Sequence, residues 1–77
     1  MRQSKYVVIQ RGTLEVPLVF PDFETHSEMA RGFKVVSAGF CNPPDSSDEN
    51  WVCWGESVSL NVSSRKEDSV LLTRVLK

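Results

Sequence analysis

GESVSLNVSSRKEDSVLLTRVLK, residues 55–77, decides the fold, because the spacing of its apolar residues changes from two to about 3.6. Apolar and polar residues alternate over 56–63, which predicts a strand with one apolar face and one face of small polar side chains. The apolar face would carry Val58, Leu60 and Val62. The polar face would carry Ser57, Ser59, Asn61 and Ser63.

The same stretch predicts a helix after the strand. Ser64 and Glu67 have the spacing of a capping box, in which the two side chains satisfy free backbone N–H groups at a helix start. The apolar residues that follow fall on one side of the helix, and we expect that side to cover the apolar face of the strand. They are Leu71, Leu72, Val75 and Leu76.

Residues 5–20 predict a β-hairpin with one apolar face. A two-residue loop would make Tyr6 and Pro17 a hydrogen-bonded pair, although proline has no N–H. A four-residue loop, with Ile9 opposite Leu14, turns the Pro17 nitrogen away from the first strand. We therefore expect the four-residue loop and an outer position for the second strand. The apolar face would hold Val7, Ile9, Leu14, Val16, Leu18 and Phe20.

The middle of the chain predicts a short helix and a buried strand. Thr25 and Glu28 form a second capping-box pattern, and Gly32 follows as a stop signal, so the helix has one or two turns. Residues 33–41 carry apolar side chains on both faces, which is typical of a central strand. Residues 42–50 form a polar loop rich in proline, serine and acidic residues.

These elements predict a single α+β domain over 1–77, in the order ββαββα. The sheet would have four strands and be mainly antiparallel, with the C-terminal helix packed on one face and the short helix between the hairpins. A chain of 77 residues has room for one small core. A deep substrate pocket with a supported catalytic shell is therefore not expected.

Charge and hydropathy indicate a cytoplasmic protein without a membrane segment. Nine Lys and Arg residues balance ten Asp and Glu residues, for a net charge of -1, which disfavours a nucleic-acid binder. The N-terminal residues lack the apolar core of a signal peptide, and no run approaches membrane-spanning length. We expect a protein partner and no membrane partner.

One acidic stretch has the residue types of a metal site. Asp22, Glu24, His26 and Glu28 would align on one face if they formed a strand. A helix start explains the same residues better, because acidic side chains favour a helix N-terminus. We therefore predict no metal site and no cofactor, and we interpret His26 as a surface residue.

The candidate nucleophiles lack a complete catalytic set. Gly55, Ser57 and Ser59 resemble a nucleophile motif, but its second glycine is absent and the serines lie on a regular strand. Cys41 and Cys53 border the polar loop and could meet across a hairpin; without an export signal we expect free, core-packed thiols. We predict no catalytic residue and a protein that is not an enzyme.

The polar loop is the best candidate for a binding surface. Asp45, Asp48 and Glu49 lie in it, and no basic residue occurs between 42 and 56. Trp51 and Trp54 follow, pointing to opposite sides of a regular strand, so that one packs in the core and the other is a candidate anchor for a partner. A solvated loop beside two core tryptophans is the simpler alternative.

Three segments resemble short uncharacterised bacterial and bacteriophage proteins. They are VVSAGFC at 35–41, GESVSL at 55–60 and SRKED at 64–68. The resemblance covers roughly the C-terminal half of the chain and includes no characterised family, so it transfers no catalytic residue. It implies a prokaryotic or mobile-element origin, and small phage proteins of this kind act by occupying a surface of a host protein.

Three hypotheses for function follow. The first is a protein-interaction module, such as a phage regulator or inhibitor, that binds a basic surface through the acidic loop and one tryptophan. The alternative is a small nucleic-acid-binding regulator, and the third is a small enzyme using His26, Cys41 or Cys53. The alternative would use the basic residues Arg2, Lys5, Arg11 and Lys34.

Overall fold

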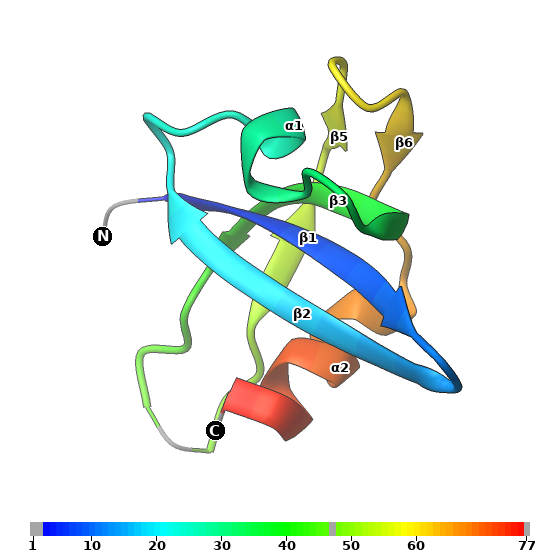
Figure 1. The fold of residues 1–77 in the computed structure, drawn as a ribbon. Helices are drawn as coiled ribbons and strands as arrows, with labels where there is room; N and C mark the ends of the chain where they lie inside the picture. Colours follow the sequence, from blue (N-terminus) through cyan, green and yellow to red (C-terminus); the bar gives the residue numbers. More distant parts are fainter. Residues whose placement is uncertain (1–2, 47, 77) are drawn as a thin grey trace.

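A four-stranded antiparallel sheet is the centre of the fold (Figure 1). The computed structural model describes residues 3–46 and 48–76. The strand order is β2-β1-β3-β4, so β3 is central and β2 lies at an edge, as predicted. The sheet strands are β1 (Ser4–Arg11), β2 (Leu14–Pro21), β3 (Lys34–Asn42) and β4 (Val52–Trp54).

The remaining elements are two helices and a small hairpin. The helices are α1 (His26–Met29) and α2 (Glu67–Leu76), and the hairpin consists of β5 (Glu56–Ser57) and β6 (Val62–Ser63). The predicted α+β class, with a short helix between the hairpins and a C-terminal helix on the sheet, is confirmed. The Thr25 cap of α1 is also confirmed, because the Thr25 hydroxyl accepts the Glu28 N–H at 3.2 Å.

The β1–β2 hairpin has a two-residue loop, so the four-residue loop is wrong. Arg11 lies opposite Leu14, and Gly12 occupies the loop with a φ of 64°. Pro17 lies opposite Val8, and this pair is non-hydrogen-bonded because the pairs alternate from the loop onward. The Pro17 nitrogen therefore points away from β1. The expectation that the Pro17 nitrogen faces away from the first strand is correct, but the strands pair in a register shifted by two residues, with Arg11 rather than Ile9 opposite Leu14.

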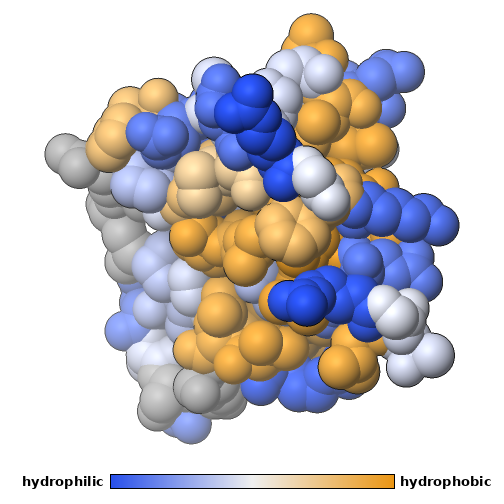
Figure 2. Space-filling view, viewed as in Figure 1, coloured by the Kyte–Doolittle hydropathy of each residue, from blue (hydrophilic) through white to orange (hydrophobic). Residues whose placement is uncertain are grey.

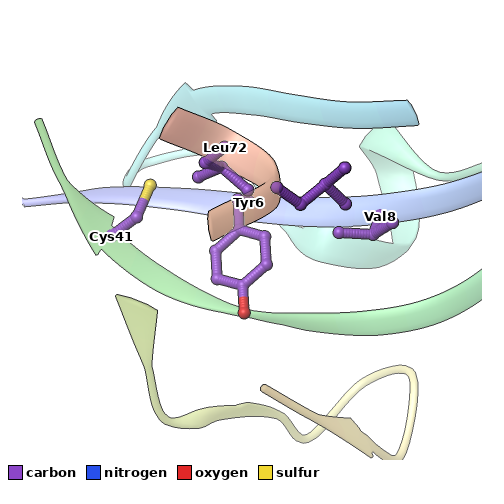
Figure 3. Close-up of a cluster of buried hydrophobic side chains, with 5 residues drawn as sticks. Tyr6, Val8, Cys41 and Leu72 are labelled. Carbon is purple, nitrogen blue, oxygen red and sulfur yellow. The ribbon is translucent and has the colours of Figure 1, made fainter. Parts of the chain in front are cut away.

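The sheet is covered on both faces by different elements. On one face, α2 packs Leu71 and Leu72 against Tyr6, Val8 and Cys41 (Figure 3), and we call these five residues the helix-side core. On the other face, α1 and the β5–β6 hairpin cover a second set of buried residues, which we call the hairpin-side core. This core consists of Val7, Ile9, Phe20, Ala30 and Ala38.

This arrangement corrects the expected position of the C-terminal helix. The helix was expected to cover Leu60 and Val62, but these residues pack against the hairpin-side core, whereas the helix covers the opposite face of the sheet, which bears Tyr6. Its apolar side is also narrower than predicted, because Val75 and Leu76 are exposed. Leu71 and Leu72 are the buried apolar residues of the helix.

The predicted strand at 56–63 is instead a tight hairpin. Val58 is 87% exposed and Ser57 is 1% exposed, the reverse of the predicted faces. The Ser57 hydroxyl accepts the Leu60 N–H at 3.3 Å and closes the turn, while Asn61 adopts a φ of 56°. Asparagine tolerates this left-handed conformation better than most residues. Leu60 and Val62 still reach the hairpin-side core, as predicted.

The buried carboxylate of Asp68 fastens the start of α2 to the sheet. It accepts hydrogen bonds from the Tyr6 hydroxyl on β1, from the Ser37 hydroxyl on β3 at 3.0 Å and from the Arg65 N–H at 2.9 Å. The Arg65 Nε also donates to it at 2.9 Å. Of the two bonds in the capping box predicted for Ser64 and Glu67, one is made one residue later, from the Arg65 N–H to the Asp68 carboxylate; arginine has no side-chain acceptor for the reciprocal bond.

Arg65 extends this network to the edge strand. Its two terminal nitrogens donate to the Glu15 carboxylate on β2 at 2.9 and 3.2 Å. These bonds hold the pKa of Glu15 below its usual range. The N-terminal end of α2 is thus joined to β1, β2 and β3.

Replacing Asp68 with alanine should destabilise the fold by about 3 kcal/mol or more, because it leaves buried donors unpaired. The matched control is Glu67→Ala, which removes an exposed carboxylate from the same helical turn and should change the free energy of unfolding by less than about 0.5 kcal/mol. Urea unfolding at neutral pH measures both values. Equal effects from the two variants would contradict a central role for Asp68.

Candidate functional site

Trp51 is anchored to α2 at the end of the polar loop. The backbone N–H of Trp51 donates to the Thr73 hydroxyl at 2.8 Å, and the backbone carbonyl of Trp51 accepts a hydrogen bond from the Ser69 hydroxyl. The Thr73 hydroxyl in turn donates to the Ser69 carbonyl at 2.7 Å. The Trp51 side chain packs against the helix-side core. Trp51 is therefore the core-packed tryptophan, and it fixes where the loop joins β4.

Trp54 is the exposed tryptophan and lies on the other face of the sheet. It stacks on Phe40 of β3, with ring centroids 6.3 Å apart, and remains 37% exposed. Val52 lies two residues before it on the same face of β4 and is 57% exposed. Gly55 follows with a φ of 82°, and a Cβ there would lie 2.9 Å from the Phe40 ring. The sheet thus presents an aromatic and an aliphatic side chain on its outer strand.

Val52 was missed by the sequence analysis. The period of two along β4 places it beside Trp54, so the signal was present. Phe40, which supports the Trp54 ring, could be found only from the pairing of β3 with β4.

The acidic loop, residues 42–50, is exposed at its tip. Asp45, Asp48 and Glu49 are all exposed. A turn holds part of the loop, because the Glu49 N–H donates to the Ser46 carbonyl at 3.2 Å. Figure 2 shows hydrophilic residues around this loop at the lower left and apolar residues over the β5–β6 hairpin at the upper right. The loop is a negatively charged rim beside β4.

His26 is buried, so its interpretation as a surface residue is wrong. It is 5% exposed, and its Nε2 lies 2.8 Å from the Gly39 carbonyl, to which it donates. Its ring contacts Phe20 and Phe40 edge-on, with interplanar angles of 82°. The first residue of α1 faces the sheet, and a helix of four residues is too short for periodicity to reveal this. His26 joins α1 to β3.

The buried histidine and the cysteines lie on opposite faces of the sheet. Cys41 belongs to the helix-side core, whereas His26 contacts Phe20 of the hairpin-side core. The sheet therefore separates the imidazole from the thiol in the described structure. Among residues 3–46 and 48–76, no three His, Cys, Asp or Glu side chains gather in a metal-binding group.

A shallow pocket of about 280 Å³ lies between α1 and the β5–β6 hairpin. Lys5, His26, Phe40 and Glu56 contribute to its lining. The Lys5 ammonium donates to the Glu24 carbonyl at 2.9 Å, and the His26 Nε2 is bound to Gly39. Both groups therefore already hold α1 and its preceding turn against the sheet.

The basic residues of the nucleic-acid hypothesis are only partly brought together. Lys34 lies opposite Gln10, next to Arg11, at one end of the sheet. Lys5 lies six residues from Arg11 along β1, which is roughly 20 Å away. Arg2 lies outside the described residues. Arg11 and Lys34 thus share one end of the sheet but not one face, because Lys34 projects on the same side as Gln10 and Arg11 on the opposite side.

Cys41 and Cys53 are free thiols that lie directly opposite each other on β3 and β4. Burial raises the pKa of both thiols to about 12. Burial and the hydrogen bond to Asp68 also raise the pKa of Tyr6. These three groups remain protonated in the fold at neutral pH.

No family model matches the chain, and neither a curated protein nor a solved structure matches it. Within the described residues, no helix has the length and apolar character needed to span a membrane.

Replacing each tryptophan with alanine should lower the free energy of unfolding more at the anchored Trp51 than at the exposed Trp54. Trp51→Ala removes packing against the helix-side core and should cost about 3 kcal/mol of folding free energy. Trp54→Ala should cost about 1 kcal/mol, because much of its ring is already in water. Urea unfolding monitored by far-UV circular dichroism measures both, and a larger loss from Trp54→Ala would contradict the assignment.

Stability should fall steeply in alkali. The pKa of a cysteine thiol is near 9 in the unfolded chain and about 12 in the fold. Between these values the unfolded state loses its thiol proton and the folded state does not, so the free energy of unfolding falls as the pH rises above about 9. Each thiol should contribute a loss of about 1.4 kcal/mol per pH unit in that range. Urea titrations between about pH 8 and about pH 11 measure the slope. Cys41→Ala should flatten it, and an unchanged slope would contradict the prediction.

Proposed function

We propose that this protein is a non-enzymatic interaction module that occupies a basic surface of another protein. The observation that carries the proposal is the exposure of Trp54 and Val52 on an outer strand next to the acidic loop. An exposed tryptophan on a fixed strand loses little conformational freedom on binding, and aromatic residues are enriched among binding hot spots. The expected partner surface combines an apolar depression with surrounding Lys or Arg residues.

The two parts of the surface have different tasks. Asp45, Asp48 and Glu49 attract a basic partner and accelerate encounter, because charges at the rim act mainly on the association rate. Trp54 supplies apolar area that the partner covers, and so lowers the dissociation rate. Trp51 positions the loop through its bonds to α2 and is not itself the main contact.

The resemblance to short bacterial and phage proteins supports a regulatory or inhibitory role in a prokaryotic cell. A small protein with a shallow pocket can act on a larger one by covering a surface that the partner needs. We propose this mode of action rather than chemistry on a substrate.

Capture from bacterial lysate tests the surface. The immobilised protein should retain a partner, and Trp54→Ala should reduce retention at least about tenfold, which is a loss of about 1.4 kcal/mol or more. Neutralising Asp45, Asp48 and Glu49 together should reduce retention and weaken its dependence on salt. The charge-matched control neutralises Asp22, Glu24 and Glu28, which lie around α1, and should leave retention unchanged.

Two results would contradict the proposal. Equal retention by the wild type, the Trp54→Ala variant and the loop variant would exclude this surface. Retention of random-sequence DNA or RNA that falls steeply with salt would favour the nucleic-acid alternative, because phosphate contacts release counterions.

A further inference from the structure

The two cysteines occupy the central pair of the β3–β4 ladder. Phe40 pairs with Trp54 on one side of them, and Asn42 pairs with Val52 on the other. Cys41 lies in the helix-side core, and Cys53 packs against that core, so both side chains are on the same face of the sheet. The thiols are therefore neighbours within a regular part of the sheet.

The alternation of hydrogen-bonded and non-hydrogen-bonded pairs along the sheet shows which kind of pair Cys41 and Cys53 form. The β1–β2 ladder starts from the bonded pair Arg11 and Leu14, so odd residues of β1 bond to β2 and even residues bond to β3. Ser4 of β1 lies opposite Cys41, which directs the Cys41 backbone groups toward β1. Cys41 and Cys53 are consequently a non-hydrogen-bonded pair. In such pairs the Cα atoms are about 4.5 Å apart and the side chains are closest.

This separation fits a disulfide without movement of the backbone. Disulfides join residues whose Cα atoms are about 4.4 to 6.8 Å apart and whose Cβ atoms face each other. We propose that Cys41 and Cys53 form a reversible cross-strand disulfide, by exchange with a low-molecular-weight disulfide such as oxidised glutathione. The two thiols lose two protons and two electrons as the S–S bond forms, and the reagent is reduced to two thiols.

The bond would act on the acidic loop. It closes a ring that contains residues 42–52, and this ring includes Asp45, Asp48, Glu49 and Trp51. Trp54 lies outside the ring. In the reduced protein the end of the loop is held by the bonds from α2 to Trp51. The disulfide adds a covalent link at its base, so oxidation restricts the loop and leaves Trp54 in place.

The exchange is slow in the folded state. Burial raises the pKa of both thiols to about 12, and the thiolate is the form that attacks a disulfide. The pair thus resists brief oxidation and responds to a sustained change in redox conditions.

The test is to incubate the folded full chain with oxidised glutathione and follow its intact mass. We expect a monomer that has lost two hydrogens, and a non-reducing peptide map that links Cys41 to Cys53. The melting temperature should rise by roughly 10 °C and return on reduction. Amide hydrogen exchange should slow in the loop, and the Cys53→Ser variant should show neither the mass loss nor these shifts.

Three results would overturn the proposal. They are dimers linked between chains, glutathione adducts on both cysteines in place of the internal bond, and oxidation that occurs only after unfolding in urea. Internal oxidation with unchanged exchange in the loop would overturn its effect on the loop. None of these readouts needs the protein partner, so they are independent of the proposed function.

Discussion

The buried carboxylate of Asp68 is the constraint on which the arrangement depends. A charge that is removed from water must be matched by several hydrogen bonds. Tyr6, Ser37 and Arg65 provide them from β1, β3 and the start of α2. Because these donors are on the Tyr6 face of the sheet, α2 must cover that face. The opposite face is left for α1 and the β5–β6 hairpin.

The two edge strands of the sheet, β4 and β2, have some of their outward backbone positions blocked. At the β4 edge, the Trp51 backbone groups are bound by hydroxyls of α2, and the Gly55 carbonyl accepts the Ser64 N–H at 2.9 Å. At the β2 edge, Pro17 and Pro21 offer no N–H groups. Part of each edge is therefore closed to pairing with another strand. A partner is more easily accommodated by the side chains on β4 than by its backbone.

Local sequence patterns predicted most of the helices and strands, whereas contacts between residues far apart in the chain determine which side chains are buried. The α+β class, the central β3, the outer β2 and the Thr25 cap follow from composition, alternation and capping residues. Alternation over 56–63 is compatible with a strand and with a tight hairpin. The hairpin forms because the Ser57 hydroxyl accepts the Leu60 N–H and closes the turn. At the candidate site, exposed loop acids and a pair of tryptophans on opposite faces were predictable. Which tryptophan is anchored depends on α2, and no local pattern reveals the burial of His26.

The bond between Tyr6 and Asp68 joins residues that are 62 positions apart in the chain. Glu15 and Arg65, which reinforce it, are 50 positions apart. During synthesis, the first hairpin therefore leaves the ribosome long before its partners exist, and its Tyr6 face must wait for α2. The sheet is therefore completed only once α2 has been made, after the two strands of the first hairpin. In a cell, the time between these events is when chaperones and proteases can bind this protein.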